Sequence, residues 1–160
     1  AQVIHPKTIK PLQNKSIPLL VKSFLDPAAE GTVIHSKSVN HLPPIIVFKN
    51  CQVLIQLNSK DFSFVSEGLT AVVDELFTRL KFKANLTQIT AISILCVVDN
   101  KAEKVEAFAL AAAEHFEVQI KRDLNLLTIR HYNEAILQEL TAGNKIVLKQ
   151  QTPEIIQVVE

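Results

Sequence analysis

The apolar positions from Cys51 onward follow the spacing of alternating strands and helices. Val53, Ile55 and Leu57 alternate with glutamines, which predicts a strand over residues 51–57. After a polar loop, apolar residues recur at helical spacing and predict a helix over residues 66–81: Leu69, Val72, Val73, Leu76 and Leu80. Gly68 lies at the start of this helix. Two interpretations of this glycine stay open. It is needed for the φ of a tight turn, or it lets another backbone segment or a small anion approach the helix start closely.

The same pattern continues to residue 120 and completes one folding unit. A strand of mixed polarity over 84–90 precedes a fully apolar strand over 92–98. A helix over 101–116 and a strand over 117–120 follow. The order β-α-β-β-α-β is the split βαβ or ferredoxin-like arrangement, with two helices on one face of an antiparallel sheet.

A second unit begins at Leu124 and is incomplete. It has a strand over 124–130, and then a helix over 133–141 with Asn133 as its N-cap and Gly143 as the left-handed residue that ends it. Strands over 145–150 and 154–159 follow. The chain then stops one helix and one strand short of β-α-β-β-α-β.

The N-terminal residues offer a helix and a strand without partners. A helix is expected over 4–14, kinked or ended by Pro11, and a strand over 17–25. Residues 32–50 read as extended and irregular. We therefore expect an α+β protein of two ferredoxin-like units, the first inserted into the second. The expected boundaries are 46–121 for the first unit, 1–26 plus 122–160 for the split second unit, and 27–45 for a connector.

Composition narrows the function classes. The chain has 160 residues, 48% of them hydrophobic, and a net charge of +1, so nothing favours nucleic acid or an anionic membrane as partner. No apolar run is long enough for a transmembrane helix. Two cysteines, Cys51 and Cys96, fit buried thiols of a cytoplasmic protein, although a disulfide between them stays open. The absence of methionine, with Ala1 inside an expected helix, indicates a fragment of a longer polypeptide.

Catalytic and metal-binding patterns are missing from the sequence. The five histidines lie on separate elements without the spacing of metal ligands: His5, His35, His41, His115 and His131. No serine has a G-x-S-x-G setting, and neither cysteine has a histidine near it in sequence. With three glycines in total, no glycine-rich loop could hold phosphates.

Several segments resemble sequences of the aspartokinase family, in the family's order and over essentially the whole chain. The resemblance is carried by four stretches: Val3-Ile4-His5-Pro6-Lys7-Thr8-Ile9, Ile17-Pro18 with Val21-Lys22-Ser23-Phe24, Asp26-Pro27 with Gly31-Thr32-Val33-Ile34, and Asn85-Leu86 to Asp99. It implies paired ACT domains, the C-terminal regulatory region of an enzyme that phosphorylates aspartate with ATP. The family's catalytic motifs have no counterpart here, so this chain is expected to be non-catalytic and without a cofactor.

The resemblance also implies partners and a site. The partners would be the enzyme's own kinase domain, a second copy of the chain through the ACT units, and an end-product amino acid, lysine before threonine. ACT units bind effectors between two domains, at the helix start after the first strand and on the second strand. That carries over to eight residues here: Ser66, Glu67, Gly68, Leu69, Ala84, Asn85, Gln88 and Thr90.

Two positions depart from the family's pattern. Lysine-sensing members carry aspartate where this chain has Asn85, and Glu67 stands where the family often has a basic or another polar residue. Threonine sensing, or a structural dimerisation module that senses nothing, therefore stay open beside lysine sensing. RNA binding is disfavoured because the central strands carry no aromatic and basic stacking surface. A small enzyme of the same fold is disfavoured because no arginine and nucleophile converge.

Overall fold

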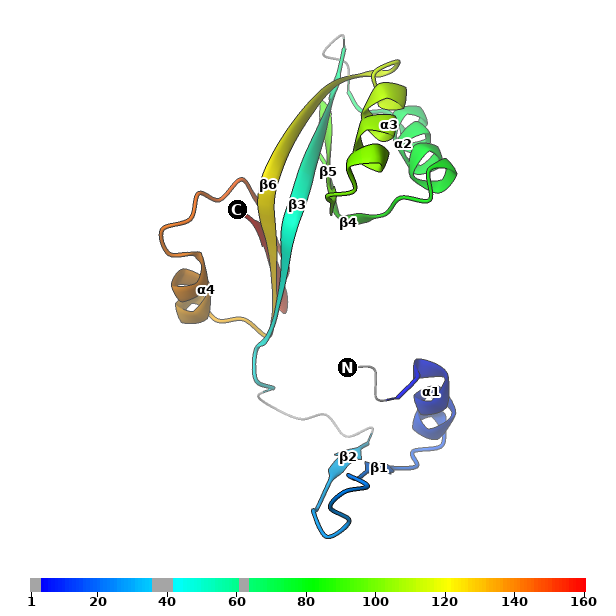
Figure 1. Cartoon of the computed structure of the whole chain (residues 1–160), viewed down its shortest axis with the longest axis vertical. Helices are drawn as coiled ribbons and strands as arrows, with labels where there is room; N and C mark the ends of the chain where they lie inside the picture. Colours follow the sequence, from blue (N-terminus) through cyan, green and yellow to red (C-terminus); the bar gives the residue numbers. More distant parts are fainter. Residues whose placement is uncertain (1–3, 36–41, 61–63) are drawn as a thin grey trace. The chain divides into compact units, whose positions relative to one another are not determined.

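The computed structural model describes residues 4–35, 42–60 and 64–160. The chain divides into two compact units, Ala1–Leu42 and Pro43–Glu160 (Figure 1). Val3 of the resemblance motif and His41 lie outside the described residues.

In the N-terminal unit, the described residues 4–35 and 42 form one helix and a small hairpin. Helix α1 (Pro6–Asn14) begins at His5, whose ring nitrogen Nδ1 accepts a hydrogen bond from the Lys7 N–H. Of the two outcomes expected at Pro11, a kink or an end of the helix, the end is wrong, because the helix continues to Asn14. Strand β1 (Leu19–Val21) is shorter than expected and pairs antiparallel with β2 (Thr32–Ile34), inside a stretch expected to be irregular.

The C-terminal unit is built on one six-stranded sheet. Its strands, in spatial order, are β4 (Ala84–Ile89), β5 (Ser93–Asp99), β3 (Ile45–Ser59), β6 (Phe116–Arg130), β8 (Ile155–Val159) and β7 (Leu148–Gln151). Every neighbouring pair is antiparallel. Strand β4 therefore forms one edge of the sheet and β7 the other.

Three helices cover this sheet. Helices α2 (Glu67–Arg79) and α3 (Ala102–Ala112) lie beside one end of the β3–β6 pair, and α4 (Glu134–Thr141) lies beside the other end (Figure 1). Phe77, Phe82 and Phe108 stack together under α2 and α3. Under α4, Leu137 packs on Leu127 and other aliphatic residues of β6 and β8. A third cluster, with Leu54 and Leu126, is formed by strand residues and joins both ends of the sheet.

Strands β3 and β6 are each longer than expected, because each passes through both halves of the sheet. The sequence predicted a strand from residue 51, but β3 already begins at Ile45. It also predicted separate strands over 117–120 and 124–130, where β6 is continuous. Both strands turn through a residue with positive φ, Cys51 (54°) and Asp123 (57°), and the pairing register shifts beside them. In the sequence, the polar residues beside Cys51 and Asp123 suggest that a strand ends there. In the structure, the backbone accommodates the extra residues as β-bulges, and both strands continue.

The fold class predicted from the sequence, an α+β fold with two ferredoxin-like βαββαβ units, is confirmed. The first unit uses β3, α2, β4, β5, α3 and the first part of β6. The second uses the rest of β6 with α4, β7 and β8, and residues 45–49 of β3 lie beside it as a further strand. The assignment of residues 1–26 to the second unit stays a prediction.

Candidate functional site

The predicted site begins at the N-terminus of α2. The Ser66 hydroxyl accepts a hydrogen bond from the Leu69 N–H (3.3 Å), and the Ser66 carbonyl accepts one from the Thr70 hydroxyl (3.0 Å). Ser66 is therefore the N-cap that the chain supplies for this helix. Ser66, Glu67 and Gly68 are all exposed, so the first turn of α2 is open to solvent.

Among the described residues, no contact and no backbone angle requires glycine at position 68. Its φ is not positive, in contrast to Gly31 (74°) and Gly143 (78°). A Cβ built on Gly68 would meet the Ser66 hydroxyl at 3.6 Å, an ordinary contact. Of the two interpretations of Gly68, a tight turn that needs the positive φ of a glycine is wrong. The other interpretation, a close approach of a group from outside the chain, stays a prediction.

The start of α2 lies beside the turn between β4 and β5. The Val65 N–H donates a hydrogen bond of 2.8 Å to the carbonyl of Ala91. Thr90, the residue before Ala91, is engaged in this turn: its hydroxyl contacts the Ser93 hydroxyl (2.7 Å) and accepts from the Ser93 N–H (3.0 Å). The structure thus brings Ser66 and Thr90 into one neighbourhood.

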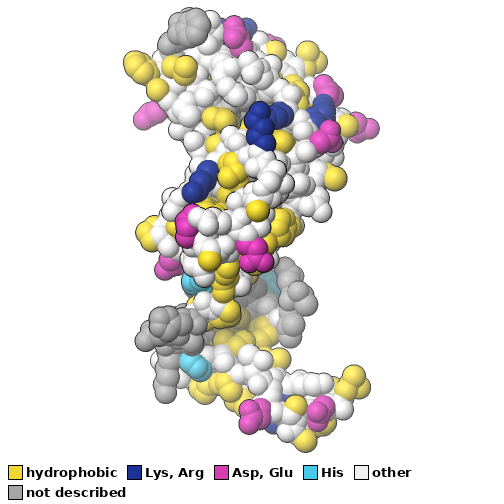
Figure 2. All heavy atoms as spheres, turned by 90° about the vertical axis from the view of Figure 1, so that its left-hand side faces the viewer, with side chains coloured by type: hydrophobic (Ala, Val, Ile, Leu, Met, Phe, Trp, Pro, Cys, Tyr) yellow, Lys and Arg dark blue, Asp and Glu magenta, His cyan; other side chains and the backbone are white. Residues whose placement is uncertain are grey.

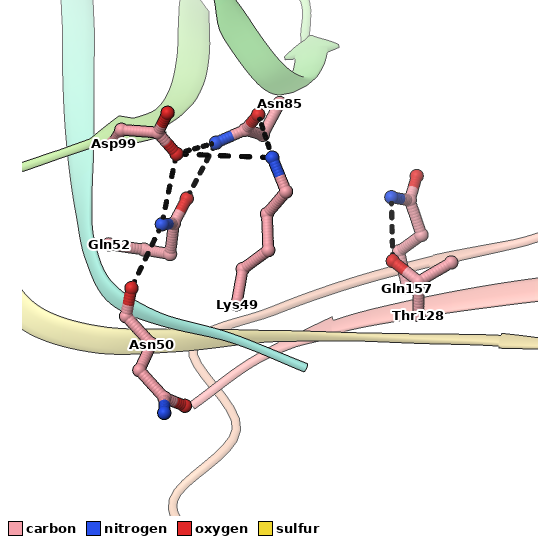
Figure 3. A network of polar contacts seen from close by, with 7 residues as sticks. All are labelled: Lys49, Asn50, Gln52, Asn85, Asp99, Thr128 and Gln157. Carbon is pink, nitrogen blue, oxygen red and sulfur yellow. Dashed lines mark hydrogen bonds and ion pairs between the residues drawn. The ribbon is translucent and has the colours of Figure 1, made fainter. Parts of the chain in front are cut away.

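Asn85 lies at the other end of β4, in a polar network (Figure 3). Its side-chain N–H groups donate to Gln52 Oε1 and to Asp99 Oδ1, both at 2.7 Å. Its carbonyl oxygen accepts from the Lys49 ammonium at 2.7 Å. Gln52 donates in turn to Asp99 at 3.2 Å, and Lys49 lies 3.9 Å from the same carboxylate. The polar atoms of Asn85 are therefore used within the chain.

The network fixes a carboxylate beside the bulge at Cys51. Hydrogen bonds from Asn85 and Gln52 hold the pKa of Asp99 below its ordinary value, and the nearby Lys49 and Lys101 charges act in the same direction. Lys49 belongs to the part of β3 that pairs with the second half of β6, whereas Asn85 and Asp99 belong to the first unit. The network therefore connects the first and second ferredoxin-like units of the six-stranded sheet, beside the bulge of β3 at Cys51.

Ala84 and Gln88 point to opposite faces of the sheet. Ala84 pairs with Val98 and packs into the core under α2 and α3. Gln88 pairs with Leu95, which packs against the cluster on the other face. Among the described residues, the Gln88 side chain has no recorded hydrogen-bond partner, so its amide is available to a ligand.

The eight predicted residues are thus only partly brought together within one chain. Residues 66–69 and Thr90 are neighbours, but Asn85 and Thr90 lie five residues apart on an extended strand, about 16 Å. A single amino acid could not touch both ends. A groove between α2 and β4 is lined by two charged residues, Asp74 and Lys83, which the sequence interpretation did not bring together because each has the pattern of an ordinary exposed charge.

Metal and nucleophile chemistry find little support in the described part of the chain. Among residues 4–35, 42–60 and 64–160, no three His, Cys, Asp or Glu side chains lie close enough together to hold a metal ion. Both cysteines are free: Cys51 is exposed and Cys96 is buried. Burial raises the pKa of the Cys96 thiol to about 12, which makes it unreactive.

The face drawn in Figure 2 has mixed charge: on the described residues seen there, Lys and Arg side chains are interspersed with Asp and Glu, and no extended basic patch is visible. Within the described residues, none of the helices has the length and apolar character needed to span a membrane.

This α+β fold of ferredoxin-like units, with an open helix start beside an edge strand, is similar to that of ACT-type domains. The resemblance to aspartokinases is confirmed, because the relatives found by sequence are aspartokinases. Lysine-sensitive aspartokinase 3 of Escherichia coli is 30% identical over 102 residues, covering 62% of this chain and 22% of the relative. Aspartokinase 1, chloroplastic, of Arabidopsis thaliana is 29% identical over 104 residues, covering 62% of this chain and 18% of the relative. The chain thus spans about a fifth of the length of these curated relatives. No family model matches the chain.

Solved structures show the same fold. The aspartate kinase of Clostridium acetobutylicum superposes on 99% of this chain and 41% of its own with a TM-score of 0.77 and 16% identity. Aspartokinase III of E. coli, in complex with lysine and aspartate, covers 99% of this chain and 38% of its own, with a TM-score of 0.71 and 19% identity. A protein assigned as a C-terminal regulatory domain of aspartate kinase from Porphyromonas gingivalis covers 73% of this chain and 85% of its own, with a TM-score of 0.62 and 13% identity.

Proposed function

We propose that this chain is the regulatory region of an aspartate kinase and binds an end-product amino acid, lysine before threonine, at an interface between ACT units. Binding there controls the phosphorylation of aspartate by ATP in the kinase domain of the same cytoplasmic enzyme. The relatives support this proposal: one is named lysine-sensitive, and the E. coli structure contains lysine. The chain itself then contributes sensing and dimerisation rather than catalysis.

The observation that carries the proposal is Gly68. The starts of α2 and α4 read Ser66-Glu67-Gly68-Leu69 and Asn133-Glu134-Ala135-Ile136. In both, the first side chain caps the N–H three residues on. Alanine fills the second helix position in α4, and glycine costs roughly 0.5–1 kcal/mol more than alanine inside a helix. Gly68 thus lowers stability slightly, and no contact among the described residues explains it, as expected where a ligand approaches the backbone.

The chemistry of this position suits the carboxylate of an amino acid. Helix N-termini present unpaired N–H groups and a partial positive charge, which favour an anion. The Gln88 side chain points to the face of the sheet away from α2, so within one chain it would not reach a ligand at this helix start. A second copy whose β4 runs antiparallel beside the first would bring the far end of its own β4 toward Thr90. The two ends that one chain keeps about 16 Å apart would then meet across the interface.

Thermal unfolding with added ligands tests the proposal. Lysine, threonine, methionine and S-adenosylmethionine would be added separately to the 160-residue chain. A ligand at a hundred times its Kd adds about 2.7 kcal/mol to the free energy of unfolding. For a protein of this size that raises Tm by roughly 5–10 °C. A shift with one amino acid names the effector.

Two matched variants show where the effector binds. Gly68→Val would fill the approach to α2, whereas Ala135→Val makes a similar change at the start of α4. We expect the ligand-induced shift to disappear in the first variant and persist in the second. Equal loss in both variants would mean that valine acts through general stability, and the site would have to be placed elsewhere.

A structural dimerisation module that senses no ligand is the second candidate. It is favoured by Asn85, whose polar atoms are bound to Lys49, Gln52 and Asp99, and by the Glu67 carboxylate, which would repel an anion at the helix start. The absence of a Tm shift with all of the tested ligands, combined with a stable dimer, would establish this alternative.

A further inference from the structure

The side-chain amide of Asn85 is oriented by its neighbours so that its carbonyl oxygen faces Lys49 (Figure 3). The amide nitrogen donates to Gln52 Oε1 and to Asp99 Oδ1, each at 2.7 Å, which uses both of its N–H groups. Gln52 is only 2% exposed and also donates to Asp99, at 3.2 Å, so it fixes this arrangement from the interior. The carbonyl oxygen of Asn85 is therefore left as an acceptor beside the Asp99 carboxylate.

The ammonium group of Lys49 fills this acceptor position from within the chain. Its Nζ lies 2.7 Å from Asn85 Oδ1 and 3.9 Å from Asp99 Oδ1. Among the described residues, no other side chain donates to the Asn85 carbonyl oxygen. Hydrogen bonds from Asn85 and Gln52 hold the pKa of Asp99 below its ordinary value, so its carboxylate is charged at neutral pH. A neutral oxygen beside a fixed negative charge suits a primary ammonium group.

The contact made by Lys49 is easily exchanged. The Lys49 side chain is 45% exposed and that of Asp99 is 50% exposed. An ion pair with this exposure is weak, because water and salt screen it. The flexible four-carbon stem of a lysine also lets its ammonium group move into solvent. Another ammonium group can therefore take the place of Lys49 beside the two oxygens.

We infer that Lys49 competes, from within the chain, with the side-chain ammonium group of an effector such as lysine for the oxygens of Asn85 and Asp99. Lys49 is then a specificity-determining residue. It weakens the binding of amino acids that carry a side-chain ammonium group, relative to amino acids with an uncharged side chain. This inference rests on the proposed function, in which the effector extends to Asn85.

Lys49→Met tests this competition, because methionine keeps a side chain of similar length without the charge. The Kd of lysine and of norleucine would be measured by isothermal titration calorimetry on the 160-residue chain. Norleucine has the carbon chain of lysine without the side-chain ammonium group. In Lys49→Met we expect the Kd of lysine to fall by about three- to tenfold and the Kd of norleucine to stay within about twofold.

A control variant and an NMR measurement show whether the effect is local. Lys83→Met removes the same charge from an exposed position just before β4, which has no recorded contact with Asn85 or Asp99, and should change neither Kd. In Lys49→Met, the side-chain amide signals of Asn85 should shift with lysine and stay in place with the same concentration of norleucine. Circular dichroism of each variant checks that it folds.

The outcomes separate this inference from the proposed function. Lysine that binds the unmodified chain and Lys49→Met equally, or binds the variant more weakly, overturns the inference and leaves the proposed function standing. An equal gain for norleucine, or an equal gain in Lys83→Met, also overturns it. Lysine that binds only Lys49→Met and shifts the Asn85 signals supports the inference, while sensing of lysine by the unmodified chain fails. Lysine that binds neither protein contradicts both.

Discussion

The side-chain amide of Asn85 donates a hydrogen bond of 2.7 Å to the carboxylate of Asp99, fourteen positions later in the chain. Asn85 occupies the position at which the family resemblance implies an aspartate in lysine-sensing members. In this chain the residue acts as a donor to a neighbouring carboxylate, so an aspartate there would face a like charge. The local surroundings therefore fit asparagine and oppose the family's residue.

Asn85→Asp is expected to destabilise the protein by about 1–3 kcal/mol, because it removes a donor and places a second carboxylate beside Asp99. Lys49 offsets part of this repulsion, since it contacts both positions. Urea unfolding at pH 7 measures the loss. The exchange variant Asn85→Asp with Asp99→Asn restores one amide and one carboxylate and should recover most of the stability. An exchange variant as unstable as Asn85→Asp alone would contradict this account.

Asp99 should make stability depend on pH in the acid range. Hydrogen bonds from Asn85 and Gln52 lower its pKa in the folded state. A carboxyl group with a lowered pKa contributes its full stabilisation above its unfolded pKa, about 3.9, and loses it as the pH falls through the folded value. Asp99→Asn should therefore flatten the decline of the urea midpoint below pH 4. The effect is small because the side chain is about half exposed (50%).

A matched carboxylate checks this pH dependence. Glu139 is exposed on α4 and has no recorded hydrogen bond or ion pair among the described residues. Glu139→Gln should leave the acid decline of the urea midpoint as it is in the unmodified protein. Equal flattening in both variants would mean that the network has no special part in acid unfolding.

The order of elements could be predicted from apolar spacing, but the joining of the two units could not. Polar Lys121, Arg122 and Asp123 interrupt the apolar pattern, so two separate strands were predicted, whereas Asp123 adopts a positive φ and β6 continues. The early start of β3 was missed for a related reason. Residues 45–48 are apolar without alternation and 43–52% exposed, so no period marks them as a strand.

The candidate site was predictable only where it depends on local sequence. The cap at Ser66 is a local feature of this kind, since a serine directly before an apolar helical run favours capping, although the helix predicted over 66–81 had included Ser66. The contacts of Asn85 could not be predicted, because Lys49 and Gln52 lie 36 and 33 positions away. The role of Gly68 could not be predicted from sequence either. The sequence is compatible with a tight turn or with a close approach, and the turn is excluded only by the φ angle seen in the structure.

Cys51 and Cys96 should differ sharply in reactivity toward a thiol reagent such as Ellman's reagent. Cys51 is exposed, whereas burial raises the pKa of Cys96 to about 12. At pH 8 only about one Cys96 in 10,000 would be a thiolate, and its sulfur is also inaccessible. We expect one thiol per folded chain to react quickly and both to react in denaturant. Cys51→Ser should abolish the fast reaction, and a fast reaction that survives this change would show that Cys96 is exposed.

Lys104 connects α3 to the end of α2. Its ammonium group donates to the carbonyls of Leu80 (3.0 Å) and Lys81 (2.6 Å). These carbonyls lie at the negative end of the α2 dipole, and Lys81 has a positive φ of 47°. Lys104→Met keeps the length of the side chain but removes both charged hydrogen bonds. We expect a loss of about 1–2 kcal/mol in urea unfolding and faster hydrogen exchange in the last turn of α2. Lys149→Met, at an exposed position on β7, should change neither quantity. A Lys104→Met variant with normal stability and normal exchange would show that water replaces the ammonium group at no cost.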